Sequence, residues 1–166
     1  RLKLKVNKEK TKVSRPMEST LLGFSFYKSQ DQWEIRVSSK TVNRIKEKVR
    51  ANTQRNNPSG NRIKIQKLEK IIRGWVNYFV IAKAKSIMQQ LDEMVRVRLR
   101  IGEWKKWKRT KTKIRELIKL GVKRHKAYEW GNSSKNYCRI AHSPILHTTL
   151  NNSYWTKQGY TGFSNY

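Results

Sequence analysis

Carboxylate side chains, which carry most metal-dependent chemistry, are scarce in this sequence. Asp and Glu together make up 11 of its 166 residues, and only Asp31 and Asp92 are aspartates. Asp92 and Glu93 are adjacent in a stretch with helical spacing, so their side chains project about 100° apart. A site that transfers phosphoryl groups with two metal ions needs carboxylates that converge. We therefore expect no metal, no cofactor and no catalytic residue in this segment.

Histidine and cysteine indicate no catalytic or metal site either. His142 and His147 are five residues apart, and Cys138 is the only cysteine, so neither a zinc-binding pair nor an internal disulfide is available. No glycine-rich phosphate-binding loop is present. We expect Cys138 to be a small buried thiol and the histidines to lie in loops or at the surface. A single cysteine is consistent with a reducing compartment.

Positive charge is the strongest feature of the composition. Lys and Arg number 39, which gives a formal net charge of +28. Self-repulsion of this size opposes folding, and binding to a polyanion relieves it. If six to ten of these cations contact phosphates, affinity falls by roughly 10³–10⁵ between low and moderate salt. Nucleic acid is the expected partner. No apolar run approaches the roughly 18 residues of a membrane span, so we expect no membrane partner.

Three arginines lie close together in a stretch with helical periodicity. Arg96 and Arg100 share one helix face, Arg98 lies between them, and Val95 and Leu99 occupy a different face. A solvated surface is the ordinary interpretation of such a face. Few acidic residues are positioned to pair with these cations, however, and this favours contacts with phosphates.

Aromatic rings alternate with cations just beyond that stretch. Trp104 and Trp107 are three residues apart and share a side, so they form either a stacking surface for RNA or part of a packed core. The same alternatives apply to Trp75 and Phe79, and packing is favoured for both pairs. Tyr78 falls off the apolar stripe and is a better candidate for ligand contact. The cations around the two later tryptophans are Lys105, Lys106, Lys108 and Arg109.

Alternating apolar residues predict strands near the N-terminus. Residues 1–20 alternate loosely and indicate one strand, and residues 22–37 indicate a β-hairpin with one apolar face and a polar turn at 28–31. Gly23 falls within the first hairpin strand, which indicates a bulge or a close approach by another backbone.

The periodicity then changes to that of helices. Ser38 or Ser39 caps a first helix, a second runs over about 63–82, and a third starts near Ser86. The predicted fold is mainly α, with an N-terminal β-hairpin, a three-helix bundle and a small, mostly helical or irregular C-terminal region. That region includes a short helix around 114–118 that ends at Gly121, and another around 140–150.

The ordered set of motifs resembles the C-terminal part of a bacterial group II intron-encoded reverse transcriptase and maturase. Residues 4–11 and 21–26 resemble the end of the palm, residues 44–50, 72–79, 91–100 and 104–108 resemble the thumb or maturase domain X, and residues 132–143 resemble the DNA-binding region. These segments read LKVNKEKT, LLGFSF, RIKEKVR, IRGWVNYF, LDEMVRVRLR, WKKWK and NSSKNYCRIAHS.

The resemblance implies a domain order of 1–37 for the end of the palm, 38–109 for the thumb and 110–166 for the DNA-binding region. It implies that the parent is a cytoplasmic, bacterial RNA-directed DNA polymerase that also assists splicing and retrohoming. Its catalytic aspartates and Mg²⁺ belong to the palm upstream. The implied partners are group II intron RNA, a template–primer RNA–DNA duplex and target DNA.

The resemblance also implies roles for particular residues. Leu22, Gly23 and Phe24 correspond to the primer grip, where a glycine lets the backbone approach the primer end. The remaining implied nucleic-acid contacts are Arg44, Lys48, Arg50, Arg73, Tyr78, Arg96, Arg100, Lys105, Lys106, Lys108, Arg109, Lys135 and Arg139.

Two other functions remain open on the sequence. The chain can be a non-catalytic RNA-binding splicing factor whose polymerase half has decayed. It can also be a ribosomal-type RNA-binding protein, although the ordered hairpin, thumb and tail disfavour this.

Overall fold

An antiparallel three-stranded sheet begins the part of the chain that the computed structural model describes, residues 13–165. Its strands are β1 (Thr20–Leu21), β2 (Phe24–Ser29) and β3 (Gln32–Val37), in that order across the sheet. A two-residue turn joins β2 to β3, and both of its residues, Gln30 and Asp31, have positive φ, which matches the right-handed twist of a hairpin. The predicted hairpin is confirmed, whereas the strand expected from alternation at the start of the chain falls largely outside the described residues.

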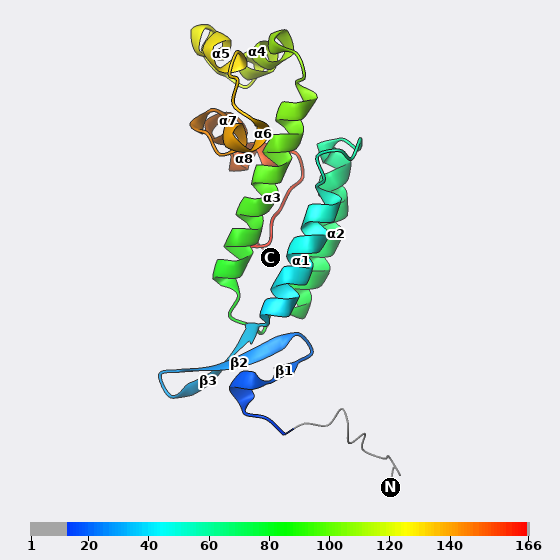
Figure 1. The fold of residues 1–166 in the computed structure, drawn as a ribbon, viewed down its shortest axis with the longest axis vertical. Helices are drawn as coiled ribbons and strands as arrows, with labels where there is room; N and C mark the ends of the chain where they lie inside the picture. The colour runs from blue at the N-terminus through cyan, green and yellow to red at the C-terminus, as the bar shows by residue number, and fades with distance from the viewer. Residues whose placement is uncertain (1–12, 166) are drawn as a thin grey trace.

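Three long helices form the central bundle (Figure 1). They are α1 (Ser39–Asn52), α2 (Asn61–Tyr78) and α3 (Lys85–Lys106). The Ser38 side chain accepts a hydrogen bond from the Thr41 amide at 3.3 Å, so Ser38 is the N-cap of α1. α2 ends four residues earlier than predicted, at Tyr78. The predicted mainly helical fold with an N-terminal hairpin is confirmed.

Apolar residues at helical spacing hold the bundle together. The fully buried side chains include Leu68 and Ile72 of α2 and Leu91, Val95 and Leu99 of α3. A second cluster joins the bundle to the sheet through Val37, Phe79, Ala82 and Ala84.

Five shorter helices follow α3. They are α4 (Thr110–Lys119), α5 (Arg124–Gly131), α6 (Tyr137–Ala141), α7 (Pro144–Thr149) and α8 (Asn152–Lys157). Figure 1 shows α4 and α5 beyond the end of α3 that is farthest from the sheet, and α6, α7 and α8 beside α3. The single helix predicted over 140–150 is wrong, because α6 ends at Ala141 and Pro144 starts a new helix. Proline fits the first turn of a helix but not its interior.

The segment after α8 passes back between α3 and α2 (Figure 1). Phe163 is fully buried there, and its ring lies edge-on to Trp75 at 5.7 Å between centroids. In residues 13–165, no helix has both the length and the apolar character that crossing a membrane requires.

Candidate nucleic-acid interface

The turn between β1 and β2 packs against the start of the bundle. Leu22 and Gly23 form it with φ values of 51° and 87°. The prediction that Gly23 lies inside a strand is therefore wrong, because Gly23 lies in a turn. A Cβ on Gly23 would lie 2.8 Å from Thr41 Oγ1 and 3.2 Å from Phe79 Cζ. The Gly23 carbonyl also accepts hydrogen bonds from the Ser38 amide and the Thr41 hydroxyl. Glycine is required here because the turn touches two helices.

A groove of about 550 Å³ opens beside this turn, between α1 and α2. We call it the hairpin groove. Its lining includes Leu22, Gly23, Arg44, Lys48 and Tyr78, so the structure brings together residues that were predicted from separate motifs. Both Arg44 and Lys48 are exposed, and they are four residues apart on α1.

Aromatic contacts fix one wall of the hairpin groove. Tyr78 is 51% exposed, and its hydroxyl donates to the Leu22 carbonyl at 3.1 Å. The ring of Phe24 stacks on Tyr78 at 5.7 Å and meets Phe79 edge-on at 4.9 Å. Leu22 is 74% exposed. The wall is therefore a rigid ring surface with an exposed apolar side chain at its edge.

Arg100 corrects the expectation of an exposed arginine face on α3. Its side chain is 4% exposed, Nε donates to the Leu150 carbonyl at 3.1 Å, and Nη1 lies 3.0 Å from His147 Nε2. Burial, and then the neighbouring Arg96, lower the pKa of Arg100. The C-terminal helices cover this face of α3, so the guanidinium binds protein groups and is not presented to a ligand. Arg96 is half-buried.

The tryptophans after Arg100 are part of the core. Trp104 is 2% exposed and Trp107 is 5% exposed, and their rings meet edge-on at 5.8 Å. The stacking surface considered for these rings is therefore wrong, and packing is confirmed. Lys113 of α4 lies over the Trp104 ring at 4.6 Å, which joins α4 to the end of α3.

Cations of α3 also hold the loop between α1 and α2. Arg98 Nε donates to Thr53 Oγ1 at 2.5 Å, and its Nη2 donates to the Arg50 carbonyl at 3.2 Å. Lys105 Nζ donates to Asn56 Oδ1 at 3.0 Å. Burial, and then Lys105 and Arg98, lower the pKa of the nearby buried Lys64. The Arg98 contact satisfies the Arg50 carbonyl at the end of α1, where a cation is favourable, and the other contacts hold the loop that follows.

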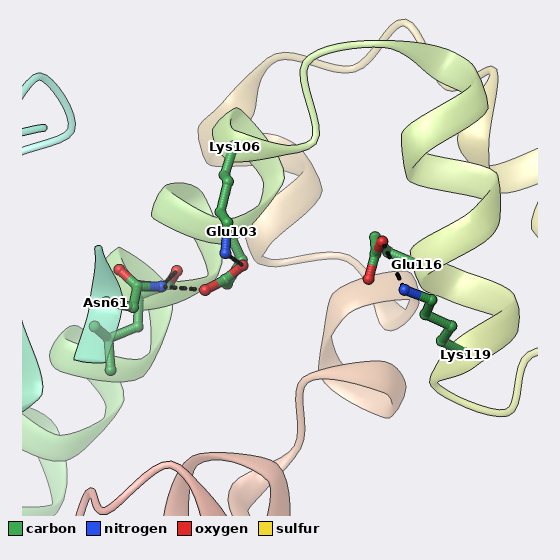
Figure 2. Close-up of polar contacts among 6 residues, drawn as sticks. Asn61, Glu103, Lys106, Glu116 and Lys119 are labelled. Atoms are coloured by element: carbon green, nitrogen blue, oxygen red, sulfur yellow. Dashed lines mark hydrogen bonds and ion pairs between the residues drawn. The ribbon is translucent and has the colours of Figure 1, made fainter. Parts of the chain in front are cut away.

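The few acidic residues around the end of α3 are engaged as well. Figure 2 shows Glu103 of α3 between Asn61 and Lys106, with distances of 3.1 Å and 3.9 Å, and Glu116 of α4 beside Lys119. The Asn61 side-chain amide also donates to the Leu99 carbonyl at 3.0 Å. These contacts join the start of α2 to the end of α3, and Lys106 offsets the charge of a buried carboxylate.

The other predicted contact residues lie on several surfaces. Arg50 is exposed at the end of α1, Arg73 is exposed on α2, and Lys108 and Arg109 are exposed between α3 and α4. Lys135 and Arg139 are exposed at α6. Only some of the predicted cations therefore face the hairpin groove.

Cys138 is exposed on α6, so the expectation of a buried thiol is wrong. It precedes the buried Ile140 and Ala141 on a helix of five residues, and it lies on the outer face of that helix. Among residues 13–165, no group of three or more His, Cys, Asp or Glu side chains is arranged to hold a metal ion.

A second groove, which the sequence did not indicate, follows the exposed face of α2. Arg62, Gln66, Lys70 and Asn77 line it together with Arg73. These residues are spaced three and four apart in the sequence, which could have indicated a shared helix face. The same spacing occurs on any solvated helix face, so it did not indicate a groove. Only the neighbouring α8 makes that face one wall of a groove.

A comparison with protein-family models bears on this helical segment. Residues 42–121 match the model of the group II intron, maturase-specific domain. The match extends from the first turn of α1 to Gly121 after α4, so it includes α2, which lines both grooves, but not α8. It supports a group II intron maturase, whereas the reverse transcriptase part of the predicted resemblance stays a prediction. A comparison with curated proteins gave no match.

Proposed function

We propose that this chain is the thumb and DNA-contacting part of a group II intron reverse transcriptase and maturase. It binds intron RNA during splicing, clamps the template–primer duplex during DNA synthesis and contacts target DNA during retrohoming. The match of residues 42–121 to the maturase-specific domain carries this proposal. The net charge of +28 supports a polyanionic partner.

The hairpin groove is the proposed place for the duplex. Arg44 and Lys48 are on a rigid helix and can contact phosphates without reading sequence, as a clamp that moves along a duplex requires. The exposed part of the Tyr78 ring offers an apolar surface to a sugar or base. Duplexes that contain RNA have a wide, shallow minor groove, so such contacts read shape and 2′-hydroxyls.

The chemistry of DNA synthesis is assigned to the upstream palm of the parent. Mg²⁺ bound there would stabilise the charge that develops on the transferred phosphate. The residues described here position nucleic acid, and those of the C-terminal region, including Lys135 and Arg139, are proposed to contact target DNA. The parent is proposed to be a bacterial cytoplasmic protein.

Filter binding with the purified 166-residue chain tests this proposal. We expect it to retain a group II intron RNA more tightly than an unrelated structured RNA of equal length and charge, with affinity that falls steeply as salt rises. Equal affinity for both RNAs would refute a maturase role. We also expect the chain alone to extend no primer, and DNA synthesis by it would contradict the assignment of chemistry to the palm.

A further inference from the structure

The exposed face of α2 presents a row of polar side chains that point the same way. With about 100° between successive residues, positions 62, 66, 70, 73 and 77 fall within an arc of about 80°. The row extends over about 22 Å of helix. Its members are Arg62, Gln66, Lys70, Arg73 and Asn77, and all five are exposed.

This row is one side of a groove of about 1210 Å³. The opposite side consists of Lys157, Gln158 and Gly159, at the end of α8. Glu69 of α2 fixes that side in place, because its carboxylate accepts hydrogen bonds from the Thr161 amide at 2.8 Å and the Thr161 hydroxyl at 2.5 Å. We call this the α2–α8 groove.

Cations in the α2–α8 groove are available to a ligand. The ion pairs within residues 13–165 use lysine and arginine residues elsewhere in the chain, at positions 28, 83, 106, 115 and 119. Arg62, Lys67, Lys70, Arg73 and Lys157 all line the groove and take no part in those pairs. A groove with this charge favours a polyanion.

Gly74 also lines the groove, beside the row and near its Asn77 end, and no packing contact in the fold requires a glycine there. It is exposed, and a Cβ built on it would meet no atom within 4 Å. Glycine inside a helix costs about 1 kcal/mol relative to alanine. The absent side chain leaves the helix backbone open at this point, next to Lys70 and Arg73, and so permits close approach by another molecule.

We propose that the α2–α8 groove binds the sugar–phosphate backbone of RNA, with Gly74 at the point of closest approach. The inference rests on the proposed function and assigns to it a second contact surface. Trp75 and Tyr78, which line the hairpin groove, project about 180° and about 120° from the centre of the row. The two grooves can therefore hold different RNA segments. The amides of Gln66 and Asn77 lie among the cations and can donate to and accept from 2′-hydroxyl groups, which favours RNA over DNA.

Variants at Gly74 test this directly, because stability and binding are expected to change in opposite directions. The probes are a labelled 20-base-pair RNA hairpin and a DNA hairpin of the same sequence. Gly74→Ala should raise the melting temperature and weaken binding to the RNA hairpin. Gly74→Leu should raise the dissociation constant for the RNA hairpin by about tenfold. Ala51→Leu adds bulk at an exposed position of α1, outside both grooves, and should bind like the unmodified chain.

The outcomes separate this inference from the proposed function. If Gly74→Leu binds the RNA hairpin normally while Arg44→Gln loses affinity, the α2–α8 groove is refuted and the proposed function stands. If the unmodified chain retains neither hairpin, both the α2–α8 groove and the proposed function are refuted. If the DNA hairpin binds as tightly as the RNA hairpin and responds equally to Gly74→Ala, the assignment to RNA is wrong. Should Gly74→Leu fail to fold, the alanine variant decides alone.

Discussion

Asp92, in the middle of α3, accepts a hydrogen bond at 2.7 Å from the hydroxyl of Tyr160, 68 residues later in the chain. Its two oxygens also accept from the Phe163 amide and from the amide and hydroxyl of Ser164. Asp92 is 3% exposed, so one buried carboxylate fastens the last segment of the chain across α3. Together with the contact between Glu69 and Thr161, this attachment holds in place the segment that follows the far side of the α2–α8 groove.

Asp92→Asn should lower the free energy of unfolding by about 2–3 kcal/mol, because an amide cannot accept from all four donors and leaves buried amides without partners. Urea unfolding followed by circular dichroism measures the change. Glu93→Gln alters the exposed neighbouring carboxylate and should have little effect. Equal stability of the two variants would show that the attachment contributes nothing.

Gly162 allows the chain to reach Asp92. Its φ is 88°, and a Cβ there would lie 2.8 Å from Asp92 Oδ1. Gly159 has a φ of 91° but open space around it. Gly159→Ala should therefore cost about 1 kcal/mol through backbone strain alone, whereas Gly162→Ala should cost at least about 2 kcal/mol. The same unfolding assay compares them, and an equal loss in both variants would rule out steric contact with Asp92.

The pair of Arg100 and His147 predicts a dependence of stability on pH. An arginine can only donate, so the His147 Nε2 that faces it must accept and be unprotonated. Burial, and then the charges of Arg100, His142 and Arg96, lower the pKa of His147, and the charge of Glu93 partly offsets this shift. The unfolded chain therefore takes up this proton first. The contribution of the pair is fully present above the ordinary value of 6.5 and is lost as pH falls through the lowered pKa of the folded chain.

Unfolding free energies at pH 8, 6.5 and 5.5 measure this effect. His147→Gln should remove part of the loss on acidification, and His142→Gln should retain it. If the His147 variant loses stability with falling pH as much as the unmodified chain, the pair does not titrate as described.

The hairpin groove predicts a change in the salt dependence of binding. Replacing Arg44 and Lys48 together by glutamine should reduce the slope of log affinity against log salt by about 2, one unit for each lost phosphate contact. Filter binding with an intron RNA at several KCl concentrations measures the slope. Lys28→Gln controls for the loss of one cation outside the groove, because Lys28 pairs with Asp31 near the tip of the β2–β3 hairpin. An unchanged slope in the double variant would remove these residues from the interface.

The sequence predicted the elements whose packing follows a simple period. Ile45 and Val49 of α1, and Leu68 and Ile72 of α2, lie at helical spacing and are buried within the predicted helices, and Ser38 caps the first helix. Such positions depend mainly on the chain near them. Gly121, at a φ of 88° after α4, likewise ends the helix where predicted.

Long-range contacts account for what the sequence did not predict. Arg100 has the spacing of an exposed residue, and only helices from about 50 residues later bury it. The contacts of Asp92 involve backbone amides that no side-chain pattern reveals. One signal was available: Asp92 borders the apolar stripe of Leu91, Val95 and Leu99, where an unpartnered carboxylate is unfavourable. No comparable pattern in the sequence indicated that Cys138 is exposed.

Crosslinking of the full chain to a group II intron RNA, with crosslinked peptides identified by mass spectrometry, tests most directly whether these two grooves hold RNA. We predict crosslinks in residues 41–48 and 62–78, which decrease as salt rises and are weaker with an unrelated RNA of equal length. Crosslinks confined to the tip of the β2–β3 hairpin, or equally strong with both RNAs, would contradict this prediction.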